Sequence, residues 1–308
     1  MKIRRVIRQD LEEIRRLDSE AWTGLWPSGK ASKYRTMSNL LCNWNDDPEG
    51  CFVAEHRGEM LGYIFSHICG SLGYIGTFGV LPDHRGTGVG QKLLRKSIKH
   101  LTSNRCSTIG LETRPENQYN VGLYLSHGFA PRYLTVAMEH AVVNGPVRGE
   151  FVEWNELDES SRAIMAKKFL VTCNIVLPGL NYVRMALTRI QALEGKLCAF
   201  GGVTNPLGFA LVRTAPKFER DEFTDAFVEA MVVRPVSEGK FIEMVRILES
   251  LSHEWGKSAV VLPVTSSNWG TMKALTRDGF RVRGTMVRML YREKIASRRC
   301  INLNSWAM

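Results

Sequence analysis

A glycine-punctuated loop, Arg85-Gly86-Thr87-Gly88-Val89-Gly90, joins two segments of different character. Residues 73–80 form an apolar run typical of a strand, whereas residues 89–101 carry apolar side chains at helical spacing. Glycine lets a backbone turn sharply and approach a ligand, and the start of a helix presents free N–H groups at the positive end of its dipole. The loop therefore predicts a binding site for an anion such as a pyrophosphate.

The spacing of the glycines excludes two common phosphate-binding motifs. A P-loop needs Lys-Ser or Lys-Thr after its last glycine, but Gly90 is followed by Gln91-Lys92. A dinucleotide-binding motif needs G-x-G-x-x-G, whereas the glycines here alternate. What remains is Arg-x-x-Gly-x-Gly, preceded by Val80-x-Pro82.

This pattern resembles the coenzyme A loop of the GNAT superfamily of acyl-CoA-dependent N-acyltransferases. Asn117, Tyr124 and Gly128-Phe129 also match the family, which has an asparagine at a helix start, a tyrosine seven residues on, and Gly-Phe just after. Seven residues are close to two helical turns, so Asn117 and Tyr124 are expected on one face. Taken alone, three glycines in a turn are also compatible with a loop that binds nothing.

The upstream residues follow the GNAT order of elements. Residues 2–7 indicate a strand, Asp10-Leu11-Glu12-Glu13 a capping box that opens a helix, and residues 51–55 with 61–65 a hairpin. The resemblance covers residues 1–142. It implies an α/β fold of the α+β kind, with a central mixed, mostly antiparallel sheet flanked by helices.

The second half of the chain looks like a degenerate copy of the first. Four anchors recur at a near-constant offset of about 150 residues, which indicates a tandem repeat. They are Leu207-Gly208-Phe209 for Leu61-Gly62-Tyr63, Val233-Arg234-Pro235 for Val80-Leu81-Pro82, Asn268 for Asn117, and Gly279-Phe280 for Gly128-Phe129. We expect two GNAT-like domains, at residues 1–145 and 151–294, and a basic, flexible tail at residues 295–308.

The copy has lost the residues that an anion site needs. Glu238, Phe241 and Glu243 stand at the positions of Arg85, Gly88 and Gly90, and Leu275 stands at that of Tyr124. A carboxylate close to a diphosphate is unfavourable by about 1–4 kcal/mol, and we expect the ring of Phe241 to obstruct the backbone. The second domain is therefore predicted to have lost CoA binding and catalysis, and to pack against the first domain or wall its substrate groove.

The resemblance implies an acetyl-CoA-dependent N-acetyltransferase that transfers the acetyl group by direct attack of an amine. Tyr124 is the candidate acid that reprotonates the CoA thiolate, since a phenol pKa near 10 is close enough to a thiol pKa of about 8.5. Packing of Tyr124 in a core is the alternative. The residues expected to bind the donor are Phe78, Gly79, Val80, Arg85, Gly86, Thr87, Gly88, Val89, Gly90 and Asn117.

The general base is the weakest part of the prediction. Some family members carry a glutamate before the loop, but residues 73–80 contain no carboxylate. Glu112 on the next predicted strand is the candidate, with Glu116 and His84 as weaker ones. An exposed position for Glu112, or a base that acts through water, is the alternative.

The acceptor is expected to be a small-molecule amine rather than a protein amine. Trp22, Trp26 and Asp46-Asp47 could receive a cationic amine, although their spacing favours two buried helices and a turn. A different class of function stays open: a CoA-binding sensor or scaffold without turnover.

Composition predicts the cellular compartment and argues against nucleic-acid, membrane and metal partners. The formal net charge is +10, with an excess of basic residues after Arg277, but no interleaved aromatic pattern predicts a nucleic-acid partner. No signal core or apolar span predicts membrane contact. The seven scattered cysteines lack Cys-x-x-Cys spacing and the histidines lack metal-ligand spacing, so we expect reduced thiols, a cytoplasmic protein and no metal.

Overall fold

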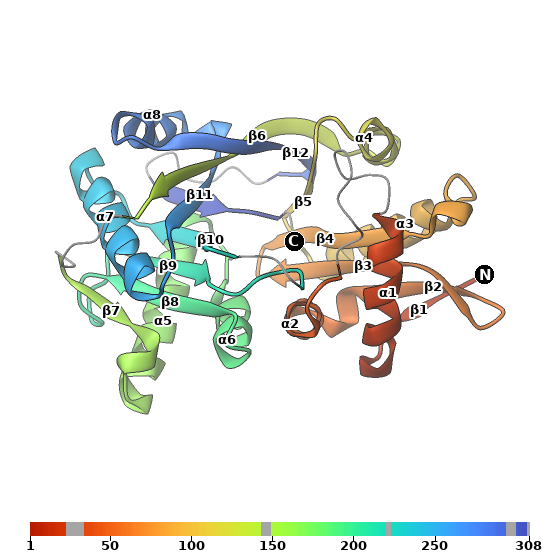
Figure 1. Ribbon diagram of the computed structural model, residues 1–308, viewed down its shortest axis with the longest axis horizontal. Coiled ribbons are helices and arrows are strands. Elements are labelled where there is room, and N and C mark those ends of the chain that lie inside the picture. Colours follow the sequence, from red (N-terminus) through yellow and green to blue (C-terminus); the bar gives the residue numbers. More distant parts are fainter. Residues whose placement is uncertain (23–33, 143–148, 220–222, 294–299, 307–308) are drawn as a thin grey trace.

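The computed structural model describes residues 1–22, 34–142, 149–219, 223–293 and 300–306. The thirteen strands in these residues form one sheet, ordered β1-β2-β3-β4-β5-β12-β6-β11-β10-β9-β8-β7, with β13 paired to β10. The sheet runs through both halves of the chain, which lie side by side (Figure 1). Trp26, and residues 295–299 and 307–308 of the predicted tail, fall outside the described residues.

The N-terminal half, residues 1–142, follows the expected order of elements. Its elements are β1 (Lys2–Arg5), α1 (Leu11–Ala21), α2 (Met37–Asp46), β2 (Cys51–His56), β3 (Glu59–Cys69), β4 (Leu72–Val80), α3 (Val89–Ser103), β5 (Thr108–Thr113), α4 (Gln118–Leu125) and β6 (Ala130–Ala141). The predicted hairpin is β2–β3. Gly128 takes the left-handed conformation that is common after a helix, with φ +85°.

The predicted capping box at the start of α1 is wrong. Asp10 precedes the helix, but its carboxylate accepts no hydrogen bond from the first turn of α1. It accepts instead from the Arg4 guanidinium at 2.7 Å and from the Ile7 N–H at 2.8 Å. The ion pair with Arg4 therefore takes the side chain that the local pattern assigned to the helix.

The C-terminal half, residues 149–306, repeats this order. Its elements are β7 (Phe151–Glu153), α5 (Glu159–Val176), α6 (Val183–Gln191), β8 (Gly195–Phe200), β9 (Gly208–Arg213), β10 (Asp225–Val233), α7 (Glu238–Glu254), β11 (Ala259–Thr265), α8 (Trp269–Arg277), β12 (Arg281–Arg292) and β13 (Ile301–Asn304). β13 corrects the expectation of a flexible tail, since residues 301–304 pair with β10 inside the sheet.

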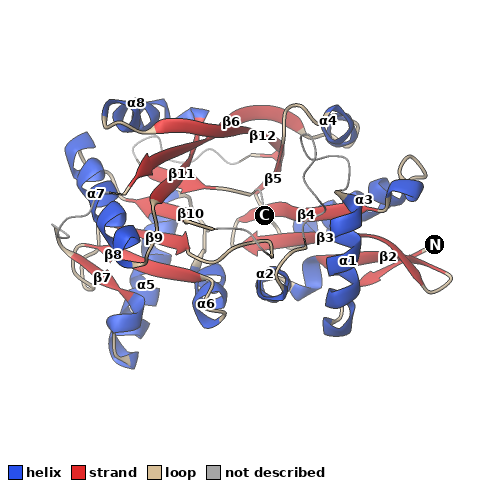
Figure 2. Ribbon diagram, in the orientation of Figure 1, coloured by secondary structure: helices blue, strands red, loops and turns tan. Residues whose placement is uncertain are grey.

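Helices cover both faces of the sheet (Figure 2). In the N-terminal half, α1 and α2 pack on one face through side chains such as Ile14 and Leu40, which are fully buried with Tyr63 of β3. On the other face, α3 buries Leu93 and Leu94 against β3 and β4. These apolar side chains recur at helical spacing, so each helix buries one stripe. α5 and α6 cover one face of the C-terminal half, and α7 and α8 the other.

The two halves exchange their last long strands. β12 of the C-terminal half lies between β5 and β6 of the N-terminal half and is antiparallel to both. On its other edge, β6 pairs with β11 from Thr135 to Ala141. Each half thus supplies a strand that covers an exposed edge of the other half. Without this exchange, β5, β6 and β11 would each have an unpaired edge.

A gap opens between β4 and β5, two parallel neighbours in the sheet. Their pairing runs from Leu72 opposite Thr108 to Ile75 opposite Leu111 and ends there. β4 then has one residue more than β3 between Ile75 and Phe78, which is a β-bulge. The rest of β4 keeps its pairing with β3, and among the described residues no strand pairs with its other edge beyond Ile75.

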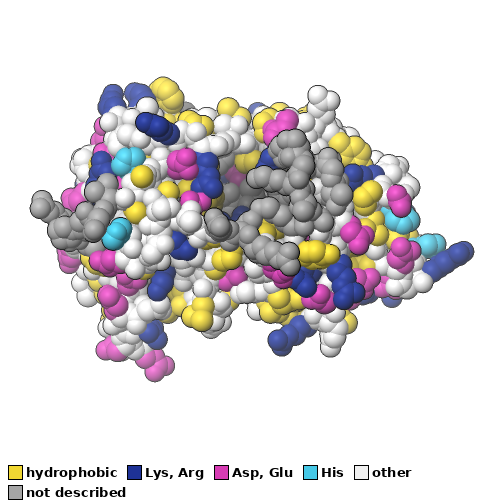
Figure 3. All heavy atoms as spheres, in the orientation of Figure 1, with side chains coloured by type: hydrophobic (Ala, Val, Ile, Leu, Met, Phe, Trp, Pro, Cys, Tyr) yellow, Lys and Arg dark blue, Asp and Glu magenta, His cyan; other side chains and the backbone are white. Residues whose placement is uncertain are grey.

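The described residues also show how charges, thiols and metal-ligating side chains are distributed. Basic and acidic side chains are interspersed over the face drawn in Figure 3. All seven cysteines are described, and each is a buried free thiol. Among the described residues, no helix is long and apolar enough to cross a membrane, and no group of three metal-ligating side chains comes together.

Candidate active site

The glycine loop connects the end of β4 to the start of α3. Gly86 and Gly88 have φ angles of +76° and +87°, a region that disfavours residues with a Cβ atom. A Cβ at either position would meet nothing within 4 Å, so these glycines serve the backbone conformation and not close packing. Gly88 is the N-cap residue of α3 and has no side chain to satisfy the first N–H groups. The helix therefore offers those donors to an anion.

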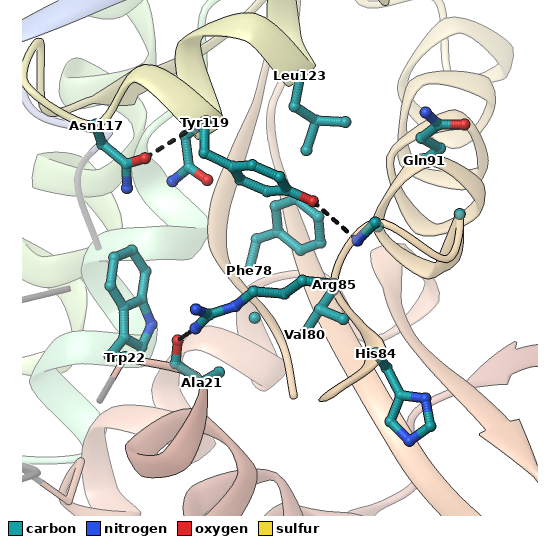
Figure 4. A pocket seen from close by; sticks show the side chains of 15 residues that line it. Ala21, Trp22, Phe78, Val80, His84, Arg85, Gln91, Asn117, Tyr119 and Leu123 are labelled. Carbon is teal, nitrogen blue, oxygen red and sulfur yellow. Dashed lines mark hydrogen bonds between the residues drawn. The ribbon is translucent and has the colours of Figure 1, made fainter. Parts of the chain in front are cut away.

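A pocket of about 290 Å³ lies in front of this loop, between β4, α1 and α4 (Figure 4). It is lined by Ala21, Trp22, Phe78, Gly79, Val80, His84, Arg85, Gly86, Gly88, Gly90, Gln91, Asn117, Tyr119, Asn120 and Leu123. The predicted donor-binding residues all line it except Thr87 and Val89. Thr87 turns its hydroxyl to the His84 carbonyl at 2.7 Å, and Val89 is buried in the core under α3.

Two side chains cross the pocket from opposite walls. The Arg85 guanidinium donates to the carbonyl of Ala21, at the end of α1, at 2.5 Å. The Tyr119 hydroxyl, from α4, accepts a long hydrogen bond of 3.4 Å from the Gly86 N–H (Figure 4). Tyr119 thus stands on one of the donors that the loop offers to an anion.

Asn117 begins α4 and turns part of its side chain to that helix. Its Oδ1 accepts from the Asn120 N–H at 3.0 Å, which caps the helix. Its Nδ2 is on the pocket side (Figure 4), where it can donate to a ligand. Sequence reasoning missed Tyr119, Asn120 and Leu123. The signal for two of them was present, because residues three and six positions after Asn117 recur on one helical face.

Tyr124, the predicted acid, lies beside the pocket and does not line it. Its ring is 5% exposed and meets Phe129 edge to face, with ring centroids 6.1 Å apart. Burial raises its pKa above the usual value near 10, which makes the buried phenol a weaker acid toward a thiolate than an exposed tyrosine. Among the described residues its hydroxyl has no hydrogen-bond partner. Tyr124 therefore has a ring packed in the core, which was one alternative, and a hydroxyl without a partner among the described residues, which the role as an acid requires.

Glu112, the predicted base, is held in a different place. Its side chain is fully buried, and Oε1 accepts from the guanidinium of Arg288 and from the hydroxyl of Thr135. Oε2 accepts from the Trp306 N–H at 2.8 Å and from the Ser305 hydroxyl at 3.2 Å. Both oxygens are thus saturated with donors, and Glu112 does not line the pocket. This geometry opposes a role in taking a proton from an amine.

The positions of Glu116 and His84, the weaker candidates, do not favour a role as the base either. Glu116 is exposed and lies 3.7 Å from Arg114, outside the pocket. His84 lines the pocket but sits in the turn just before the glycine loop. No Asp or Glu is among the described residues that line the pocket.

The corresponding region of the C-terminal half is built differently. α7 begins at Glu238, which is the counterpart of Arg85, so a helical turn replaces the glycine loop. Glu238 pairs with Arg277 and Glu243 with Lys240. Phe241 does not stand in a cradle as expected, because its ring is 2% exposed in the core under α7.

The side of α1 and α2 opposite the loop is covered by the C-terminal half. The Thr36 N–H donates to the Lys217 carbonyl at 3.0 Å, and the Glu219 N–H donates to the Tyr34 carbonyl at 2.8 Å. Asp46 does not face an acceptor site, since it lies 3.1 Å from the buried guanidinium of Arg189 on α6. Trp22, at the pocket wall, donates its indole N–H to Asp18 at 3.1 Å.

Comparison with known proteins agrees with this geometry. Residues 11–129 match the model of the acetyltransferase (GNAT) family. An acetyltransferase of Pectobacterium atrosepticum is 31% identical over 131 residues, which are 39% of this chain and 82% of that protein. The mycothiol acetyltransferase of Thermobispora bispora is 33% identical over 126 residues, which are 36% of this chain and 43% of that protein.

Solved structures match the whole chain. A putative acetyltransferase from Pyrococcus horikoshii has a TM-score of 0.68 at 17% identity, covering 99% of this chain and 95% of that one. A tandem GNAT protein from the clavulanic acid biosynthesis pathway has a TM-score of 0.58 at 13% identity, covering 96% and 99%. The chain therefore belongs to the GNAT family of acetyltransferases, and it carries two GNAT-like domains in tandem.

Proposed function

We propose that this chain is an N-acetyltransferase that transfers the acetyl group of acetyl-CoA to a primary amine by direct attack in a ternary complex. The observation that carries the proposal is the pocket at the splayed end of β4. It joins an anion-binding loop, a free strand edge and the Asn117 amide in one groove. A molecule with a diphosphate at one end and a chain of amide groups next to it matches that order of donors and acceptors.

The roles of the residues follow from their places. The N–H groups at the start of α3 and in the loop bind the pyrophosphate, and Arg85 adds positive charge beside it. The free edge at Gly79 and Val80 pairs with the pantetheine amides, and Asn117 donates to them from the opposite wall. The thioester then lies toward the gap between β4 and β5.

Tyr124 acts as the acid in this proposal. The departing thiolate needs a proton, and the Tyr124 hydroxyl, which has no competing partner among the described residues, supplies it; its raised pKa makes this transfer harder than from an exposed phenol. For the amine, the proposal uses no carboxylate: the amine reaches the thioester neutral or loses its proton to water. Glu112 is replaced in this scheme, because its oxygens are occupied by Arg288, Thr135 and the segment at Ser305.

A small acceptor is favoured over a protein. The segment at Lys217–Glu219 of the C-terminal half lies against residues 34–36, so a broad protein surface would meet it on approach to that side. One relative is named for the acetylation of mycothiol, a small molecule. We propose a reducing compartment, the cytoplasm, since every cysteine is a free thiol. Residues 1–145 and 151–294 are proposed as the two repeat units.

The test is a titration with acetyl-CoA and with CoA by calorimetry, followed by an amine panel in which release of free thiol is measured. We expect one site per chain and turnover with at least one small amine. Binding of one CoA with no turnover across polyamines, amino sugars, amino acids and peptides would favour a CoA sensor. A Gly88→Glu variant that binds acetyl-CoA as tightly as the wild type would refute the loop assignment.

A further inference from the structure

The two halves have equivalent clefts at the same place in their sheets. β4 and β10 each have nine residues, and Leu72 pairs with Thr108 as Asp225 pairs with Ala259. Each strand has one extra residue a few positions on, which forms a bulge. Beyond the bulge, Phe78, Gly79 and Val80 line the pocket of the N-terminal half. The same positions of the C-terminal half are occupied differently.

β13 fills the second cleft. Its residues pair antiparallel with β10, from Ile301 opposite Val233 to Asn304 opposite Ala230. Leu303 is fully buried in the core beneath α7. Asn268, the counterpart of Asn117 at the start of α8, donates its side-chain N–H to the Asn302 carbonyl at 3.3 Å. The chain's own strand therefore occupies the strand edge and the asparagine side-chain N–H whose counterparts face the pocket in the first cleft.

Beyond β13 the chain passes into the N-terminal half. The Asn304 carbonyl accepts from Arg288 at 2.7 Å, and the Trp306 N–H donates to Glu112 at 2.8 Å. The Trp306 ring is 4% exposed, lies parallel to Tyr74 of β4, and has the Arg288 guanidinium 3.9 Å from its centroid. Any Cβ at Gly110 would come within 2.5 Å of this ring. Residues 305–306 thus contact both strands, β4 and β5, next to the point where they separate.

We propose that the C-terminal half has converted its donor cleft into a strand-binding cleft whose ligand is the chain's own C-terminal segment. The ligand class is an extended peptide, bound by backbone pairing to β10 and anchored by one apolar side chain, Leu303. The same segment is a positioning element, because Trp306 fixes β5 against β4. This second part rests on the proposed function, whereas peptide binding does not.

The first experiment uses a chain that ends at Arg299 and a synthetic peptide of residues 300–308. We expect calorimetry to show one peptide per chain, and binding at least tenfold weaker for a peptide with Leu303→Asp. A folded truncated chain that binds neither peptide, or both equally, would overturn the proposal. Acetyl-CoA is absent from this assay, so its outcome does not depend on the transfer activity.

Hydrogen exchange on the intact chain covers the case in which the truncated chain does not fold. The amides of residues 301–304 are expected to exchange as slowly as those of residues 230–233. A full-length Leu303→Asp variant should lose protection at residues 301–304 and at the β10 amides that face β13, whereas the β10 amides that face β9 stay protected. Exchange of residues 301–304 at the rate of an unstructured peptide would contradict the proposal.

The positioning role is tested with Trp306→Ala and Trp306→Phe. Trp306→Ala should lower kcat by about ten- to a hundredfold through misplacement of β5, with the KM for acetyl-CoA unchanged within about twofold. Trp306→Phe keeps a ring on Tyr74 and should recover most of kcat. Wild-type turnover in Trp306→Ala would refute this role but leave the strand-binding cleft intact.

Discussion

Glu112 of β5 and Arg288 of β12 form a buried ion pair that joins the two halves of the chain. The guanidinium donates to Glu112 Oε1 through Nε at 2.9 Å and through Nη2 at 2.6 Å. The two side chains are 0% and 7% exposed. β12 covers the edge of β5, and this pair holds it there. A residue that the sequence suggested as a base is therefore a link between the halves.

Loss of that pair should cost stability rather than catalytic proton transfer. Glu112→Ala leaves a buried guanidinium with one partner fewer, so we expect the free energy of unfolding to fall by about 3–5 kcal/mol in denaturant titrations. Glu112→Gln should cost less and keep the pH dependence of kcat/KM. Disappearance of an acidic limb from that profile in the Gln variant would restore Glu112 as the base.

Tyr124→Phe should lower kcat and leave donor binding intact. Removal of the hydroxyl keeps the ring packed on Phe129 but removes the proposed proton for the thiolate, which is worth about 10²–10⁴-fold. Steady-state rates and acetyl-CoA calorimetry on the same sample separate the two effects. Tyr133→Phe is the control, because that hydroxyl bonds Glu293 outside the pocket. Equal rates in both variants would remove Tyr124 as the acid.

A pair of glycines at equivalent positions tests the loop. Gly86 has φ +76°, whereas its counterpart Gly239 lies in α7 with nothing within 4 Å of a Cβ. Gly86→Ala forces the left-handed conformation on alanine at about 1–2 kcal/mol and should weaken acetyl-CoA binding about tenfold. Gly239→Ala should leave binding unchanged and raise stability by up to about 1 kcal/mol. Binding by calorimetry and thermal melts measure both; a reversed pattern would contradict the assignment.

His67 predicts a pH dependence of stability. Burial lowers its pKa to about 3, so the folded chain keeps it neutral while the unfolded chain binds a proton below about pH 6.5. Its contribution is complete above pH 6.5 and declines as the pH falls toward 3, by up to about 1.4 kcal/mol per pH unit. Asp46, 3.6 Å away, has its pKa raised to about 7 by burial and gives the opposite slope between pH 4 and 7.

The two slopes are separated by comparison with His67→Phe, which keeps a ring beside Tyr74. We expect the difference in unfolding free energy between wild type and variant to shift in favour of the variant as the pH falls from 6.5 to 4. Urea titrations at several pH values measure this difference. A difference that stays constant across that range would show that His67 is protonated in the fold.

Separate expression of the halves should fail. Residues 1–145 alone would leave both edges of β6 and the outer edge of β5 without the strands β11 and β12. We expect aggregation of either half alone and recovery of soluble protein when residues 1–145 and 149–308 are produced together. Gel filtration of the co-expressed fragments is the measurement, and a soluble, monomeric N-terminal fragment would refute the prediction.

Local chemistry in the sequence was enough to place the glycine loop and most elements. Gly86 and Gly88 could be assigned because a left-handed backbone before an amphipathic helix leaves a visible pattern. Spacing reports which face of an element a residue occupies, not what lies opposite.

Tertiary structure alone decided which residues contact Glu112 and that residues 301–304 form a strand. The carboxylate meets Arg288 across 176 residues of sequence and Trp306 across 194, contacts that no local periodicity encodes. Residues 301–304 looked like part of a basic tail because four residues are too few to signal a strand. They are ordered by an edge of β10 that exists only once the C-terminal half has folded. The sequence by itself determined most elements and the glycine loop. Strand exchange and buried ion pairing, which depend on contacts between distant residues, decided which side chains are left available to a ligand.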